Sequence, residues 1–205
     1  MSGTIIVDYG RGNLFSLSQA LTFLGITHRI SADPSEVVTA DRVVLPGVGA
    51  FGDGMAALEA TGLAPALREV HARGTRLVGI CLGMQLMAAR GEEFGDHAGL
   101  GLIPGVVRRL PEGEGDEAIR VPNVGWRRLR PTPGGAALLD GRSMMYFVHS
   151  YAMAPEDPAH VMATITFNGQ EVAVAVRAGN SIGVQFHPEK SGPAGLTLLR
   201  HLLDA

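Results

Sequence analysis

The sequence holds one cysteine among 205 residues, and it lacks any long apolar run. One cysteine excludes an internal disulfide and any cysteine-rich zinc site. The seven histidines form no HExxH motif and no paired ligand spacing, so we expect neither a metal site nor a cofactor. The longest apolar run, residues 77–89, is shorter than the roughly 20 residues that cross a bilayer, so no membrane span is expected.

An excess of charge of one sign is also missing. The net charge is −3, which gives no basic field for nucleic acid or for an anionic membrane. The chain opens on a strand-like segment without a charged leader followed by an apolar signal core, so we expect a cytoplasmic protein. At this length we expect one domain, residues 1–205, that buries roughly 70% of the surface of the unfolded chain.

Strand-like and helix-like segments alternate in the N-terminal half of the chain. The first predicted helix has Asn13 at its N-cap and Gly25 just after its end. In the C-terminal half the strand-like segments are closely spaced, and Asn168-Gly169 is typical of a hairpin turn. We therefore expect an α/β single domain with a mixed central sheet flanked by helices, parallel in the N-terminal half and antiparallel in the C-terminal half. The predicted strands are 4–8, 28–30, 42–45, 76–81, 106–110, 144–150, 161–167, 171–176 and 182–186, and the predicted helices are 14–24, 65–73 and 196–203.

Four further segments carry local predictions. Apolar spacing of three and four residues predicts a helix from Leu82 to Ala89, with Gly91 as its stop. Residues 33–35 and 122–126 are predicted as turns, the second containing glycine and the only tryptophan. Residues 110–117 are predicted as a solvated acidic loop.

The only cysteine, Cys81, ends a strand-like run inside the sequence Gly79-Ile-Cys-Leu-Gly83. Flanking small residues leave room for a nucleophile at a sharp turn from strand to helix. Unpaired N–H groups at such a helix start favour a thiolate, and the Leu82 N–H could stabilise an oxyanion. The alternative is that Cys81 is an inert, buried, small apolar residue.

A formal GxGxxG lies between Gly47 and Gly52 and permits a dinucleotide site. That motif requires an acidic residue about twenty positions later, near the end of the next strand. The next strand ends at Cys81, and Glu69 lies within a helix-like segment. No lysine follows the glycines, which also removes a Walker-type loop. We therefore expect this loop to present backbone N–H groups beside Cys81.

The base for a nucleophilic cysteine is predicted at His187. Pro188 favours extended angles at His187, and in an extended segment residues two apart point the same way. The Glu189 carboxylate can therefore accept the Nδ1–H of His187 and leave Nε2 to take a proton from a thiol. If their strands share a sheet, Cys81 and His187 both lie beyond its strand ends. The alternative is an exposed His-Pro-Glu turn.

These motifs resemble those of the class I glutamine amidotransferases. Residues 79–85, 46–49 and 185–189 match family motifs in order and spacing. Residues 8–13, 122–126, 146–151 and 189–191 make the chain similar to the glutaminase subunits of imidazole glycerol phosphate synthase. The resemblance implies Cys81 as nucleophile, His187 as acid and base, and Glu189 as its orienter. It also implies oxyanion donors at Val48 and Leu82, and substrate-binding residues at Gly49, Gln85, Glu93, His149, Ser150 and Tyr151.

The resemblance also implies a partner, a separate cyclase subunit with a (β/α)8-barrel fold, in a heterodimer with lyase activity in histidine biosynthesis. The implied glutaminase is weak until the partner and its substrate bind, and the segment 46–49 is the expected switch. The acidic segment 110–117 matches no motif of the family, and Gly192 stands where a second serine is common. The candidates for the partner interface are Asn13, Asn123, Trp126, Tyr146 and Lys190.

Three alternatives stay open at this point. The first is another class I glutaminase that serves a different synthase. The second is a thiol peptidase or γ-glutamyl hydrolase with the same triad, which activity on glutamyl peptides but not on free glutamine would reveal. The third is a noncatalytic binding module, in which Cys81→Ala alters no turnover.

Overall fold

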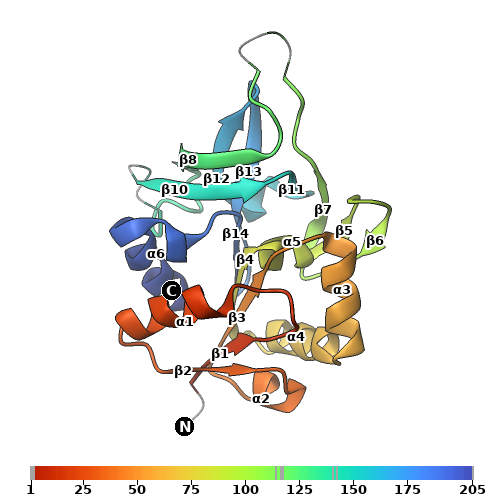
Figure 1. Ribbon diagram of the computed structural model, residues 1–205, viewed down its shortest axis with the longest axis vertical. Helices are drawn as coiled ribbons and strands as arrows, with labels where there is room; N and C mark the ends of the chain where they lie inside the picture. The colour runs from red at the N-terminus through yellow and green to blue at the C-terminus, as the bar shows by residue number, and fades with distance from the viewer. Residues whose placement is uncertain (1–2, 114, 116–117, 140, 142, 205) are drawn as a thin grey trace.

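The computed structural model describes residues 3–113, 115, 118–139, 141 and 143–204. Strands and helices alternate through the N-terminal half, as predicted. The labels follow Figure 1, where the N-terminus lies at the opposite end of the molecule from the strands β8 and β10. The elements of this half are β1 (Thr4–Val7), α1 (Leu14–Phe23), β2 (His28–Ser31), α2 (Pro34–Val38), β3 (Arg42–Gly47), α3 (Phe51–Ala60), α4 (Leu63–Ala72), β4 (Arg76–Cys81) and α5 (Leu82–Leu86).

The second half is mostly strands and closes on one long helix. No helix among the described residues is long and apolar enough to cross a membrane. The elements are β5 (Ala88–Gly91), β6 (His97–Ala98), β7 (Ile103–Arg109), β8 (Asn123–Arg128), β9 (Arg130–Pro131), β10 (Met144–His149), β11 (Tyr151–Pro155), η1 (Pro158–His160), β12 (Val161–Phe167), β13 (Gln170–Ala178), β14 (Ser181–Val184), η2 (Pro188–Lys190) and α6 (Gly192–Asp204).

The central sheet has eight strands in the order β2-β1-β3-β4-β14-β13-β12-β9. Its first five strands are parallel, and β14 is antiparallel to β13. The expected mixed sheet is thus confirmed, but its division into two halves of the chain was too simple. The last strand, β14, inserts beside β4 and runs parallel to it, and this places the two chain segments that carry Cys81 and His187 next to each other.

Two smaller sheets hold the other strands. One pairs β8 with β10 in antiparallel register, and the other has the order β11-β7-β5-β6. In Figure 1 the β8–β10 pair lies across the end of the central sheet, on the side where α1 and α6 also lie. These sheets therefore build walls above the carboxyl ends of the parallel strands, where open α/β sheets place their ligands.

The parallel strands are apolar on both faces because helices cover both. In β1, Ile5 and Val7 enter the core with α3, α4 and α5, whereas Ile6 enters the core with α1 and α6. In β3, Val43 and Val44 divide between the two cores in the same way. This alternation within a continuous apolar run is what a doubly covered parallel strand requires.

The end signals of the first helix are confirmed. Asn13 caps α1 through Oδ1, which accepts the Ser16 N–H at 3.2 Å, and Gly25 follows the C-cap with a φ of +68°. A local side chain and a left-handed glycine were enough to predict this helix, because both ends are decided within a few residues.

The predicted helix from Leu82 to Ala89 begins at Leu82 as expected, but its predicted end was wrong. The helix ends at Leu86, and residues 88–91 form β5, which pairs with β7. Gly91 lies inside that strand, where a Cβ would approach the Phe51 ring to 2.6 Å, so the glycine serves close packing rather than a helix end. Leu82, Gln85 and Leu86 are buried on the helix, whereas Ala89 is exposed on β5, so the pairing of β5 with β7 overrides the helical spacing at its last position.

Two predicted turns were also wrong. The segment 122–126 lies mostly in β8, which pairs residue for residue with β10. Residues 33–35 begin α2, with Asp33 as the N-cap that accepts the Ser35 N–H at 2.8 Å. The predicted acidic loop 110–117 includes residues 114, 116 and 117, which lie outside the described residues.

Candidate functional site

The candidate site lies at the carboxyl ends of β3, β4 and β14. Gly47 of β3 pairs with Cys81 of β4, and Val184 of β14 pairs with Ile80. The chain beyond β14 continues through Gln185 to His187, so both predicted reactive residues stand at the ends of adjacent parallel strands. The sequence-based expectation that they share one sheet edge is confirmed.

Cys81 is held in an unusual backbone conformation. Its φ is +56° and its ψ is −114°, at the turn from β4 into α5. A Cβ on Gly83 would lie 1.8 Å from the Leu45 carbonyl oxygen, and one on Gly79 would lie 2.8 Å from the Gly83 oxygen. The two flanking glycines are therefore required so that strand and helix can meet at this sharp turn, which presents the cysteine at the sheet edge.

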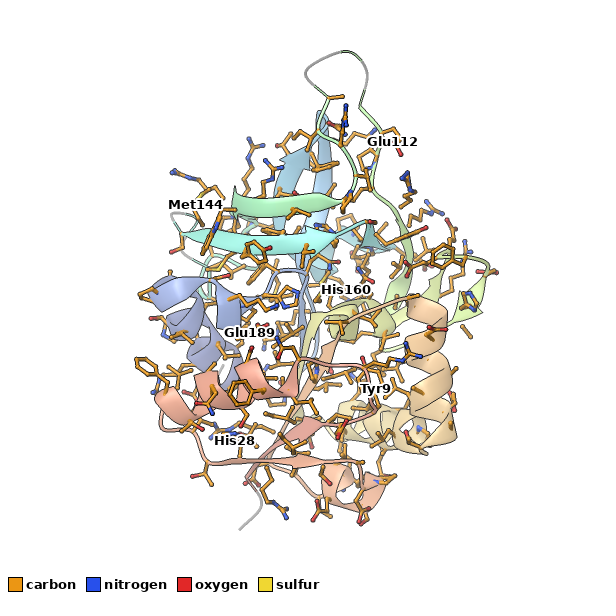
Figure 2. The ribbon with its side chains drawn as sticks, viewed as in Figure 1. Tyr9, His28, Glu112, Met144, His160 and Glu189 are labelled. Carbon is orange, nitrogen blue, oxygen red and sulfur yellow. The ribbon has the colours of Figure 1, made fainter. Side chains whose placement is uncertain are left out.

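His187 and Glu189 form a buried pair. Nδ1 of His187 and Oε1 of Glu189 are 2.8 Å apart, and both side chains are 4% exposed. Burial by itself lowers the pKa of His187, but the attraction of Cys81 and Glu189 outweighs it and raises this pKa to about 9. No hydrogen-bond partner for the buried Nε2 is present among the described residues, so its interaction with the sulfur is looser than a formed hydrogen bond. Figure 2 shows Glu189 between α1 and the β10 region.

A cavity of about 410 Å³ opens above Cys81 and His187. It brings together both predicted oxyanion positions and all six predicted substrate-binding positions. These are Val48, Leu82, Gly49, Gln85, Glu93, His149, Ser150 and Tyr151.

The two predicted oxyanion donors differ in their orientation. Leu82 follows Cys81 at the start of α5 and lines the cavity. The Val48 N–H, in contrast, donates to the Arg11 carbonyl at 2.8 Å, so in this conformation it cannot donate to an oxyanion. The Tyr9 hydroxyl donates to the Pro46 carbonyl at 2.9 Å, and burial raises the pKa of Tyr9, with the charge of Cys81 adding to the effect. The segment 46–49 is thus held on both sides by the loop after β1.

Glu93 and His149 stand on the walls of the cavity. Oε2 of Glu93 accepts the N–H of Phe51 at 2.8 Å, so its carboxylate caps α3, which has no capping side chain of its own. Burial lowers the pKa of His149 to about 4, and its imidazole is therefore neutral at pH 7.

The prediction that Asn123 belongs to the partner interface does not fit the structure. Its side chain is fully buried. It lies 2.9 Å from Nε2 of His149 and accepts a hydrogen bond from Nε of Arg127 at 3.0 Å. The sequence placed it in an exposed turn, whereas β8 points it inward beneath the cavity wall.

The other interface candidates lie on or near the surface. Trp126 is 49% exposed, and its ring contacts that of Tyr146 edge-on at 5.9 Å. Lys190 is exposed at the end of η2, and Asn13 is half-buried at the start of α1. On the same outer face of the β8–β10 pair, the exposed apolar side chains are Val124, Met144 and Val148.

One residue beside the Cys81 sulfur was missed by the sequence reasoning. Gln185 is fully buried, and its Nε2 lies 3.8 Å from the sulfur of Cys81. The signal was available in part, because the residue stands two positions before His187 within a matched motif. Its contact with the sulfur depends on the register of β14 against β4, which a sequence does not give.

Metal binding finds no support in the part of the chain that the structure describes. It contains no group of three or more histidine, cysteine or acidic side chains that could hold an ion. The arrangement of a buried cysteine, an imidazole and a carboxylate at one cavity is suited to nucleophilic attack on a carbonyl carbon.

A family model described as glutamine amidotransferase class-I matches residues 5–204 of this chain. The imidazole glycerol phosphate synthase subunit HisH of Moorella thermoacetica (strain ATCC 39073 / JCM 9320) is 48% identical over 198 residues, which cover 96% of this chain and 91% of that protein. The HisH subunit of Geobacter sulfurreducens (strain ATCC 51573 / DSM 12127 / PCA) is 43% identical over 206 residues, which cover 98% of each chain.

A solved structure described as a crystal structure of glutamine amidotransferase has the same fold. It superimposes with a TM-score of 0.74 over 98% of this chain and 99% of that one. Its sequence identity is 20%, so this likeness concerns the fold alone.

Proposed function

The chain belongs to the class-I glutamine amidotransferases, among the HisH subunits of imidazole glycerol phosphate synthase, and we propose that it hydrolyses glutamine to glutamate and ammonia through Cys81. The ammonia passes to a cyclase subunit, which uses it to make imidazole glycerol phosphate and aminoimidazole carboxamide ribonucleotide in histidine biosynthesis. The two subunits form a heterodimer.

The single observation that carries this proposal is that Cys81 and His187 line one cavity while Glu189, buried behind it, holds Nδ1 of His187 at 2.8 Å. His187 takes the thiol proton at Nε2, and Glu189 holds the imidazolium through Nδ1. The sulfur bonds to the carboxamide carbon of glutamine, and the carbonyl electron pair moves to oxygen. When the oxyanion collapses, the C–N bond breaks and His187 protonates the leaving ammonia. Water, deprotonated by His187, then cleaves the thioester and releases glutamate.

The cavity walls suit a free amino acid. Glu93 presents a carboxylate that can attract the ammonium group of glutamine, although one of its oxygens already accepts the Phe51 N–H. Gly49, Ser150 and Tyr151 line the cavity beside it and offer backbone groups that can orient the substrate.

The conformation of the segment 46–49 supports a low glutaminase activity of the chain without its partner. Of the two proposed oxyanion donors, the Val48 N–H is occupied because it donates to the Arg11 carbonyl, which leaves the Leu82 N–H for the oxyanion. Removing one oxyanion donor typically costs a factor of roughly 10² to 10³ in turnover. We infer that the partner and its substrate turn the strand 46–49 so that Val48 donates into the cavity. Val48→Pro, which removes this N–H, should abolish the partner's stimulation, and an unchanged stimulated rate would remove the strand from the mechanism.

The outer face of the β8–β10 pair fits the cyclase. It exposes a cross-strand row of apolar and aromatic side chains, and aromatic anchors are enriched at the centre of protein interfaces. Trp126 and Tyr146 meet edge-on at the middle of this row, and Lys190 supplies a positive charge nearby on η2. We place the interface on this face, with Asn13 at its edge and with Asn123 acting only from inside.

Glutamate release by the purified chain tests the proposal. The rate is measured alone, with a barrel cyclase, and with the cyclase and its nucleotide substrate. A low basal rate that rises sharply with both is expected. High activity without a partner would place the chain in another branch of the family, and activity on glutamyl peptides but not on glutamine would make it a hydrolase of those peptides.

Cys81→Ala supplies the control for this test. The variant should release no glutamate, yet it should still bind the cyclase, which should still turn over with free ammonia. Glutamate release equal to that of the unmodified chain would exclude Cys81 as the nucleophile. Loss of glutamine hydrolysis together with loss of cyclase binding would indicate a folding defect.

A further inference from the structure

We propose that Gln185 is a positioning residue whose amide nitrogen donates a hydrogen bond to the sulfur of Cys81. A network of hydrogen bonds among buried side chains fixes which end of this amide faces the sulfur. The proposal rests on the role of Cys81 as the nucleophile. It adds a third contact to the sulfur's surroundings, besides His187 and the start of α5.

The backbone fixes where Gln185 stands. Its N–H donates to the Val174 carbonyl at 2.9 Å, and the register of β14 beside β4 places it next to Cys81. The side chain is fully buried, and its amide nitrogen lies 3.8 Å from the sulfur. A buried amide that ends on a reactive sulfur must be oriented, because its oxygen in that place would repel a thiolate.

The orientation follows from the Tyr151 carbonyl, which can only accept. Gln85 must therefore turn its amide nitrogen toward it, and that nitrogen lies 2.9 Å from the Tyr151 oxygen. The second N–H of the same nitrogen points to Oε1 of Gln185 at 2.9 Å. Turning either amide over would set two donors or two acceptors against each other. The nitrogen of Gln185 is thereby left facing Cys81.

A second arm of the network reaches the same carbonyl from the other side. Arg127 can only donate, so Asn123 accepts through its oxygen and turns its nitrogen toward Nε2 of His149. His149 is neutral, accepts there, and donates through Nδ1 to the Tyr151 carbonyl at 2.9 Å. The Tyr151 oxygen thus receives two donors, one on each of its lone pairs, and each member of the chain has one allowed orientation.

The donor has a definite consequence for the sulfur. A thiolate accepts a hydrogen bond well and a neutral thioester sulfur accepts poorly, so Gln185 stabilises the free thiolate more than the acylated enzyme. Between turnovers it holds the sulfur in one position. During deacylation it favours the thiolate as leaving group, since the S–C bond electrons return to the sulfur that Gln185 faces.

Alkylation of Cys81 by iodoacetamide tests this role without glutamine or a partner. Cys81 is the only cysteine, so uptake of one label measures its reactivity directly. Gln185→Met keeps the side chain's approximate volume and removes the donor. We expect the midpoint of its pH profile to rise by about one unit and its alkylation rate at pH values below that midpoint to fall about tenfold, as expected for one hydrogen bond to a charged group.

The matched control is Ser181→Ala, which removes a buried hydrogen bond to His71 at the other end of the same strand. It should leave the pH profile in place. An unshifted profile for a folded Gln185→Met would overturn the proposal. If circular dichroism shows that Gln185→Met does not fold, Gln85→Met tests the proposal instead, because it keeps Gln185 but removes the group that orients its amide. The pH profile of Gln85→Met should shift in the same direction by a smaller amount. An unshifted profile would refute the role of the network.

Glutamate release with the cyclase is measured on the same preparations. A shifted alkylation profile in a chain that never hydrolyses glutamine would refute the proposed function and keep the contact between Gln185 and the sulfur. Normal glutamine hydrolysis with an unshifted alkylation profile would keep the proposed function and refute the contact between Gln185 and the sulfur.

Discussion

Replacing Glu189 by glutamine removes the charge that stabilises the His187 imidazolium and changes almost nothing else. The two side chains are 4% exposed and their polar atoms are 2.8 Å apart, so water cannot take over the interaction. The amide that replaces the carboxylate can still accept the Nδ1–H through its oxygen, and the ring keeps its place. What is lost is the difference between a charged and a neutral acceptor.

A hydrogen bond to a charged group contributes about 1.5–3 kcal/mol, which corresponds to one to two pH units on the imidazole. The pKa of His187, about 9 in the unmodified chain, should therefore fall toward roughly 7–8. If the thiolate–imidazolium pair is the reactive form, the same free energy lowers kcat/KM about 10- to 150-fold at neutral pH.

The assay is the pH dependence of glutamine hydrolysis in the complex with the cyclase and its nucleotide. The basic limb of the profile should move to lower pH in Glu189→Gln. His187→Ala is the comparison, because it removes the proton acceptor itself and should cost more than Glu189→Gln. Equal losses in the two variants, or an unmoved basic limb, would refute the role of Glu189 as an orienting charge.

Three further outcomes follow from the described contacts. Trp126 is the only tryptophan, so docking of the cyclase should shift its fluorescence emission to shorter wavelength. Trp126→Ala should weaken the complex by about 2 kcal/mol, or roughly 30-fold in Kd. The control is Ile30→Ala, at an exposed site on β2, and equal affinities of the two variants for the cyclase would place the interface elsewhere. Lys190 is the only lysine, so an amine-to-amine cross-linker should join the cyclase through it, and cross-linking confined to the amino terminus would argue against η2 at the interface. The pKa of His149 is about 4 in the folded chain and about 6.5 in the unfolded chain, so the unfolded chain takes up the proton first as the pH falls. The stability that the neutral, buried His149 contributes is therefore complete above pH 6.5 and declines by up to a few kcal/mol as the pH falls toward 4. If the urea midpoint of His149→Leu fell as steeply between pH 7 and 5 as that of the unmodified chain, this reasoning would be contradicted.

The candidate reactive residues were predictable because much of their geometry is local. The glycines around Cys81 determine that the backbone can make its sharp turn, and Pro188 keeps His187 at extended angles. The predicted contact of Glu189 with His187 forms, but Glu189 makes it from the 3-10 helix η2 and not from an extended segment. Asn13 and Gly25 likewise fixed the ends of α1. Each of these features depends on residues within about four positions of each other, so the sequence by itself determined them.

Partners distant in the chain decided the rest. The helical spacing runs from Leu82 to Ala89, but pairing with β7 makes residues 88–91 a strand. Pairing with β10 likewise makes the segment with Trp126 part of β8 rather than a turn. The same pairing buries Asn123. The orientation of the Val48 N–H toward Arg11 and the approach of Gln185 to the sulfur both depend on which strands lie side by side. The sequence therefore determined which groups could react, whereas the tertiary structure decided which N–H groups face the reacting atoms, because hydrogen bonds between strands far apart in the chain are set by register and not by local preference.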